Sequence, residues 1–226
     1  MCSKQHTTEL SHTAKSYLNL LLSSIDAKDW DMFTEAALKN PATFRSLDNI
    51  LAATSEFNGM SFLHAAVRQN PPLNIVAGIT KICPDAPSRR DCLNRTPLHV
   101  AAGVGASAGV IKFLATLAPE TCQVQDEDGR TPLHFACDVD CQLFEGEGRR
   151  RDPPSHDVVY ALLSANSVPA AMEDADEMSP LEYAIFSNAD IKVVKLLQRA
   201  AQKQMKKMDA SRKQSDNKRV SLRAAA

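Results

Sequence analysis

Three histidines recur in one sequence frame, and their chemistry is the first question the chain raises. They are His64, His99 and His134, and the two best-preserved copies of the frame read RTPLHVAA (residues 95–102) and RTPLHFAC (residues 130–137). An imidazole beside a hydroxyl is a pairing used in nucleophilic catalysis, and imidazoles are also zinc ligands. The spacing of these side chains must decide between such chemistry and a structural role.

The spacing is constant. The three histidines follow one another at intervals of 35 residues, and the motif returns as MSPLEYAI, with Glu182 standing 48 residues after His134. The later apolar pair of each unit ends at Val76, Ile111 or Val159, always 23 residues before the next motif (99 − 76, 134 − 111 and 182 − 159). One 35-residue period therefore runs throughout, and the third unit carries 13 extra residues.

That period argues against a shared site. Stacked helical units place equivalent residues roughly 10 Å apart, the usual distance between packed helices. Zinc ligands lie about 2 Å from the metal, so histidines one unit apart cannot ligate the same ion. We therefore interpret the histidines as structural.

The motif itself predicts the start of a helix. Thr96 or Thr131 can cap the helix through its hydroxyl, and the proline that follows suits the first helical position, where no N–H is needed. The histidine falls at the third helical position, from which one ring nitrogen can bond back to the threonine and the other can reach a neighbouring unit. The predicted structural caps are Thr96, His99, Thr131, His134 and His64.

Each unit reads as a short helix, a turn, a longer helix with apolar residues at i, i+3 and i+4, and an extended polar loop. With the Thr-Pro-Leu-His tetrapeptides at 96–99 and 131–134, and Asp128-Gly129 before the second, the units resemble ankyrin repeats. The resemblance covers about residues 58–202. The first and last units depart from it, with Ser61-Phe62 in place of Thr-Pro and Glu182 in place of the histidine, as terminal units do.

The predicted fold class is all-α: an ankyrin-repeat solenoid of about four helix-turn-helix units, with the 13-residue insertion in the third and a helical N-terminal cap. Residues 1–14 are predicted to be a flexible N-terminus. Residues 15–57 form the cap or a degenerate repeat, read as two helices, with Trp30 covering the first repeat. Residues 58–202 are the repeats. Residues 203–226 are a basic C-terminal tail, predicted to be disordered beyond about residue 208 because apolar residues become rare there.

Composition narrows the class of protein. The 226 residues are 44% hydrophobic and 23% charged, enough to bury one substantial core, and a net charge of −1 gives no overall reason to expect nucleic acid as a partner. The six cysteines follow no framework spacing, which favours reduced thiols inside the cell. Without a signal-like or membrane-spanning stretch, the predicted location is the cytoplasm, the nucleus or both, and we expect a monomer.

Two further patterns could carry chemistry. Cys137 and Cys141, with His134 and His156, could hold a metal, but their spacing is unspecific and His134 is wanted as a cap. The glycines of GVGASAG (residues 103–109) suggest a phosphate loop, but they follow a helix and lack the closing Lys and Ser or Thr, so a turn is favoured. We therefore predict no catalytic, cofactor-binding or metal-binding residue, no small-molecule substrate, and a protein that is not an enzyme.

The resemblance implies a non-catalytic interaction module that binds a partner protein through its concave face and the fingers between repeats. Charge in these loops favours a partner with a basic segment, mainly through orientation and association rate, although solvated loop charge explains it equally well. Three arginines of the insertion are included as candidates because a long exposed loop can serve recognition. The predicted partner-binding residues are Arg89, Arg90, Asp126, Glu127, Asp128, Arg149, Arg150, Arg151, Glu173, Asp174, Asp176 and Glu177.

The alternative is a regulatory or accessory subunit, an inhibitor or tether of an enzyme or transcription complex, with the basic tail as a phosphorylation or nuclear-localisation switch. Residues 192–226 carry eleven Lys or Arg against two Asp, and Ser215 and Ser221 follow basic pairs of the kind that basophilic kinases read. One hypothesis is that the tail docks on the acidic fingers and that phosphorylation weakens the docking. Nuclear targeting or binding to an anionic membrane surface competes with it.

Overall fold

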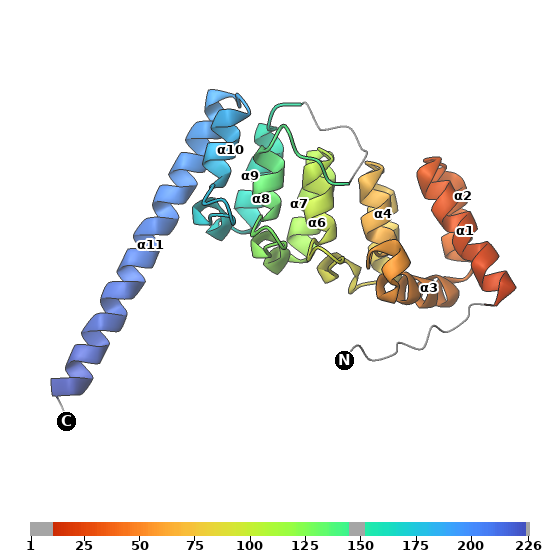
Figure 1. Ribbon diagram of the computed structural model, residues 1–226, viewed down its shortest axis with the longest axis horizontal. Helices are drawn as coiled ribbons and strands as arrows, with labels where there is room; N and C mark the ends of the chain where they lie inside the picture. The colour runs from red at the N-terminus through yellow and green to blue at the C-terminus, as the bar shows by residue number, and fades with distance from the viewer. Residues whose placement is uncertain (1–10, 145–151, 225–226) are drawn as a thin grey trace.

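The structure is a computed structural model that describes the backbone of residues 11–144 and 152–224, without the side chains of residue 55 and residues 212–224. Within these ranges all the regular elements are helices, stacked side by side along one axis (Figure 1). The predicted all-α class is confirmed for this part of the chain.

Two rows of helices make up the stack. The short helices are α4 (Phe62–Arg68), α6 (Pro97–Gly103), α8 (Pro132–Cys137) and α10 (Pro180–Phe186). The longer ones are α5 (Leu73–Ile82), α7 (Ala108–Leu117), α9 (His156–Ala165) and α11 (Ile191–Ala224). Each helix packs against its neighbours within its own row, so the helix-turn-helix units follow one another along the stack. Short 3-10 turns lie at η1 (Ser55–Phe57), η2 (Ala86–Ser88), η3 (Pro119–Gln123) and η4 (Val168–Ala171).

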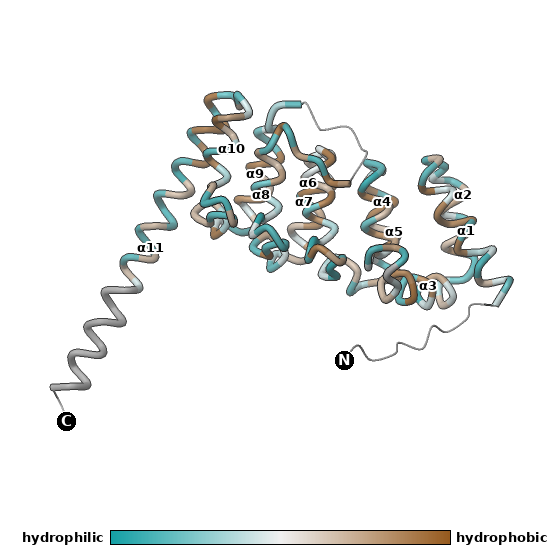
Figure 2. Tube along the Cα trace, in the orientation of Figure 1, coloured by the Kyte–Doolittle hydropathy of each residue, from teal (hydrophilic) through white to brown (hydrophobic). Residues whose placement is uncertain are grey.

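The core runs between the rows as one continuous cluster of hydrophobic side chains, most of them aliphatic. The leucine of each Thr-Pro-Leu-His frame lies in it: Leu98 and Leu133 are each 1% exposed. Burying one such side chain contributes about 1.5–3 kcal/mol to folding. In Figure 2 the hydrophobic colour is concentrated in the stacked helices and much of the hydrophilic colour lies in the loops at their ends.

The N-terminal cap contains three helices where two were predicted: α1 (His12–Asp26), α2 (Trp30–Lys39) and α3 (Pro41–Ala53). The difference arises at Asn40-Pro41. The Asn40 side chain accepts a hydrogen bond from the backbone N–H of Thr43 at 3.1 Å, and Pro41 takes the first helical position. This pair therefore ends one helix and begins another, because proline suits a helix start as well as it stops a helix.

A chain of aromatic rings joins the cap to the first repeat. Trp30 meets Phe33 edge-on, Phe33 meets Phe44 edge-on, and Phe44 stacks on Phe62 of α4 with ring centroids 4.6 Å apart. The ring stacked on the first repeat is thus Phe44, and Trp30 stands at the outer end of the series.

The basic tail also differs from its prediction. Helix α11 continues to Ala224 and leads away from the stack, whereas the sequence predicted disorder beyond about residue 208 (Figure 1). Between residues 191 and 224 there is no Gly or Pro, and Ala, Lys, Gln and Arg predominate. These residues favour helix formation without a packed face. Loss of apolar residues signalled the end of core contacts and not the end of the helix.

Candidate functional site

The histidines of the repeated frame join successive units. The Nδ1 atom of His99 accepts the backbone N–H of Thr96 at 3.0 Å, and its Nε2 lies 3.1 Å from the carbonyl oxygen of Val124 and 3.2 Å from that of Arg130. Since Nδ1 is an acceptor, Nε2 carries the proton and donates to these carbonyls. His64 and His134 repeat the arrangement, with Nε2 3.0 Å and 3.1 Å from a carbonyl oxygen of the following unit.

Burial keeps these rings neutral. Desolvation lowers the pKa of His64 to about 4, of His99 to about 3 and of His134 to about 4. Both nitrogens of each ring are used within the fold, so neither is available to a substrate or a metal. Among the described side chains, which end at residue 211, no group of three or more His, Cys, Asp or Glu is arranged to hold a metal ion.

The fingers are the turns that lead into α6, α8 and α10, at residues 91–95, 126–130 and 173–178. Each is organised by an aspartate, Asp91, Asp126 or Asp174, whose Oδ1 accepts the N–H groups two and four residues later. Two of these, Asp126 and Asp174, were predicted to bind a partner, but their oxygens shape the turn. Asp91 was missed, although it stands 35 residues before Asp126 and the period could have revealed it.

The fingers are also bonded to one another. The N–H of Glu127 donates to the carbonyl of Leu93 at 3.1 Å, and the N–H of Ala175 donates to that of Asp128 at 2.9 Å. Gly129 has a φ of +76°, and a Cβ atom there would lie 3.0 Å from the backbone nitrogen of Ala175. These contacts hold the finger turns as a connected row.

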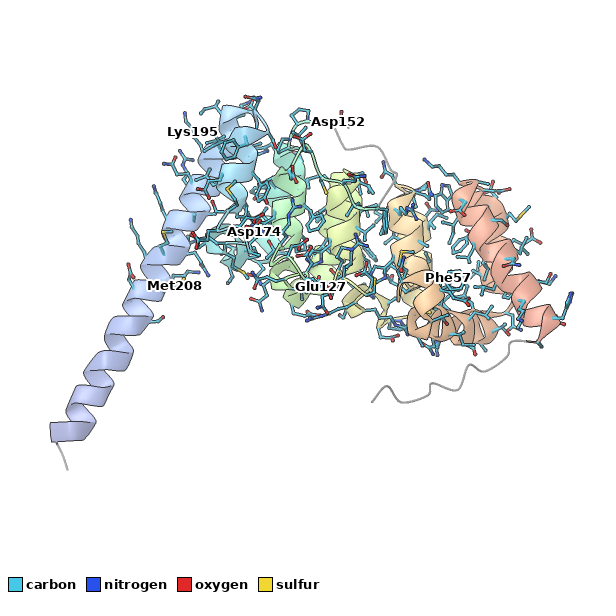
Figure 3. All side chains as sticks on the ribbon, viewed as in Figure 1. Phe57, Glu127, Asp152, Asp174, Lys195 and Met208 are labelled. Carbon is cyan, nitrogen blue, oxygen red and sulfur yellow. The ribbon has the colours of Figure 1, made fainter. Side chains whose placement is uncertain are left out.

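Five carboxylates stand exposed on the second and third fingers, where Figure 3 labels Glu127 and Asp174. Among residues 11–144 and 152–211, no ion pair includes any of them. We call this set the finger carboxylates: Glu127, Asp128, Glu173, Asp176 and Glu177. They are the predicted partner-binding acids that remain accessible.

The arginines that were predicted to bind a partner differ in exposure and in their ion pairs. Arg89 pairs with Asp48 of α3 at 2.9 Å and with Asp85 at 2.7 Å, and only 16% of its side chain is exposed. It therefore ties the cap to the repeats and is not available to a partner. Arg90 is exposed. Arg149, Arg150 and Arg151 lie outside the described residues.

Asp48 is the buried end of that tie. It is fully buried, accepts the backbone N–H of Phe62 at 2.7 Å, and has a pKa raised by desolvation despite the opposing effects of that N–H and of Arg89. No pattern in the sequence pointed to it, because its charged partner lies 41 residues away.

The inner surface of the short helices is less open than the resemblance implied. Every residue of α6 and α8 is buried. Over α8, the guanidinium of Arg130 lies 4.6 Å from the ring of Phe135 and 4.8 Å from that of Tyr183, and it pairs with Asp138 at 2.6 Å. Accessible side chains are found instead on the fingers and on α10, where Phe186 is 74% exposed.

Comparison with known proteins agrees with this architecture. A sequence model described as ankyrin repeats (3 copies) matches residues 63–144. No curated protein matches the chain. None of the helices in the described ranges is both long enough and apolar enough to cross a membrane. Ankyrin repeats generally mediate protein–protein interaction and are typically non-catalytic. This match lies over the capped, stacked helices from α4 to α8, so residues 63–144 of the chain form ankyrin repeats.

Proposed function

We propose that this protein is a non-catalytic interaction module that binds a basic segment of a partner protein along its finger carboxylates. The observation that carries the proposal is five exposed carboxylates on two turns that are bonded to each other; no described side chain forms an ion pair with them. An aspartate holds each turn in shape, so little conformational entropy is lost when a partner binds. Acidic groups on a rigid row favour basic partners through orientation and association rate.

The test uses a fluorescein-labelled Lys-rich peptide and fluorescence anisotropy at low salt. The test variant neutralises the finger carboxylates with five substitutions: Glu127→Gln, Asp128→Asn, Glu173→Gln, Asp176→Asn and Glu177→Gln. The control variant makes the same change in charge at exposed acids elsewhere: Asp26→Asn, Asp31→Asn, Glu35→Gln, Glu56→Gln and Asp157→Asn.

We expect the finger variant to lose at least about tenfold in affinity, which corresponds to about 1.4 kcal/mol, while the control keeps most of its binding. Equal losses in both variants would show that only net charge matters and would refute the site. Cellular partners captured by the intact protein and lost by the finger variant alone would then identify the natural ligand.

A second candidate role concerns the tail. Lys203, Lys206 and Lys207 are exposed on α11 where this helix leads away from the stack (Figure 1). This position favours a separate attachment, a tether or nuclear-localisation segment. Nuclear accumulation of a fluorescent reporter carrying residues 203–226, compared with a reporter whose Lys and Arg are changed to Gln, tests that role.

A further inference from the structure

The insertion of the third unit folds back over the earlier units. After α8 the chain runs past α6 toward α4 as far as residue 144 (Figure 1). Cys141 is 3% exposed and Leu143 is 8% exposed, and Phe144 packs partly buried against the core. We call residues 141–144 the strap.

Leu143 of the strap sits in a place that only a glycine leaves open. Gly103 ends α6, and a Cβ atom built on it would lie 2.8 Å from both terminal carbons of Leu143. In the next unit the equivalent residue, 35 positions later, is Asp138, which pairs with Arg130. In unit two, by contrast, Leu143 occupies the space that a side chain at position 103 would need.

Two arginines hold the other parts of the strap. Arg95 donates from Nη1 to the carbonyl oxygen of Leu143 at 2.5 Å, and its guanidinium carbon lies 4.7 Å from the ring centroid of Phe144. The guanidinium carbon of Arg68 lies 4.1 Å from the same centroid. Arg95 is itself oriented by Asp91 at 2.7 Å. A guanidinium group over the face of an aromatic ring is attracted to it by about 0.5–2 kcal/mol.

These contacts have the form of peptide recognition. They comprise an apolar seat for an aliphatic side chain, a donor for its backbone carbonyl, and an arginine clamp for the aromatic residue that follows. The seat and clamp belong to α4, α6 and the first finger, whereas the strap belongs to unit three. None of the three contacts requires the strap to be part of the same chain.

We propose that the inner surface of α4 and α6 is a binding site for a segment of another protein with an aliphatic residue followed by an aromatic one, and that the strap is its resident occupant. A short covalent link gives the strap an effective concentration of about millimolar. A competing segment that is present at a lower concentration must therefore bind the site more tightly than the strap does. This site is separate from the finger carboxylates and does not depend on the function proposed for them.

The experiment supplies the strap in trans. The probe is a fluorescein-labelled peptide of residues 138–144 carrying Cys141→Ser, and the receptor is the full chain with Leu143→Ala and Phe144→Ala. We expect this receptor to bind the probe at least about tenfold more tightly than the wild type, whose site is occupied. A probe with both strap residues changed to Ala should not bind.

A pair of glycine variants in this receptor locates the site. Gly103→Ala fills the leucine seat and should abolish binding of the probe. Gly78→Ala on α5, where an added Cβ would meet nothing within 4 Å, should leave binding unchanged. Circular dichroism checks that each receptor is folded, and Phe144→Ala alone serves as receptor if the double variant unfolds. Absence of probe binding to a folded receptor, equal binding by the two glycine variants, or equal binding by the wild type would overturn the proposal.

Discussion

Mild acid should unfold this protein through its three buried histidines. In the unfolded chain a histidine has a pKa near 6.5, whereas in the fold burial lowers the pKa of His64 and His134 to about 4 and of His99 to about 3. The unfolded chain therefore binds more protons than the folded one between these values. Stability is fully present above about pH 6.5 and is lost as the pH falls toward about 4.

The magnitude follows from the same values. Between pH 7 and about pH 5, each buried histidine removes about 1.9 kcal/mol from the free energy of unfolding, so three remove about 5.7 kcal/mol. The free energy of unfolding of a whole domain is only about 5–15 kcal/mol. Burial raises the pKa of Asp48 and Asp126, which acts in the opposite direction as the pH falls and reduces the net loss. Near pH 5 the histidines should make stability change by about 3–4 kcal/mol for each pH unit.

Urea denaturation followed by circular dichroism at several pH values measures this slope. His99→Gln removes one buried imidazole and should lower the slope by about one third. His156→Gln is the control, because that side chain is 48% exposed. Two results would refute the assignment of the histidines as buried, neutral links between units. One is a free energy of unfolding that stays constant between about pH 7 and pH 5, and the other is an unchanged slope in His99→Gln.

Three other outcomes are expected. Arg89→Met should lower the free energy of unfolding, measured by urea denaturation, by about 3 kcal/mol because it leaves buried Asp48 without its charged partner. Arg90→Met, at the exposed neighbour, should change it by less than about 0.5 kcal/mol. Equal effects would contradict the link between cap and repeats. Gly129→Ala should destabilise by more than about 1 kcal/mol, since it strains a positive φ and crowds the next finger, and a neutral result would show that the fingers are not rigid. Removal of residues 203–226 should leave affinity for the Lys-rich peptide unchanged, whereas increased affinity on truncation would restore docking of the tail on the fingers.

The repeated frame shows which features a sequence reveals. A capping box is a set of hydrogen bonds within four residues, so Thr96 and His99 could be paired from their spacing alone. The turn aspartates are equally local, and Asp91 was overlooked only because its period of 35 residues was not followed into the fingers. In α11 the apolar residues become rare well before the helix ends, because helix propensity does not require a packed face.

Other features depend on contacts between distant parts of the chain. Arg89 and Arg90 are adjacent and chemically identical, yet one is tied to Asp48 and the other is exposed. Gly103 has the sequence pattern of a turn residue, yet Leu143, 40 residues later, packs against it. No local pattern distinguishes these cases, because burial depends on which segments the fold brings together.

By itself the sequence determined the period, the helix starts, the structural role of the histidines and the place of the insertion, because each follows from bonds within a few residues or from exact repetition. Only the tertiary structure decided that Phe44 covers the first repeat, that five finger carboxylates remain exposed, and that the strap closes the inner face of α6. The reason is physical: hydrogen bonds in a cap act over a few residues, whereas exposure is set by the packing of the whole chain.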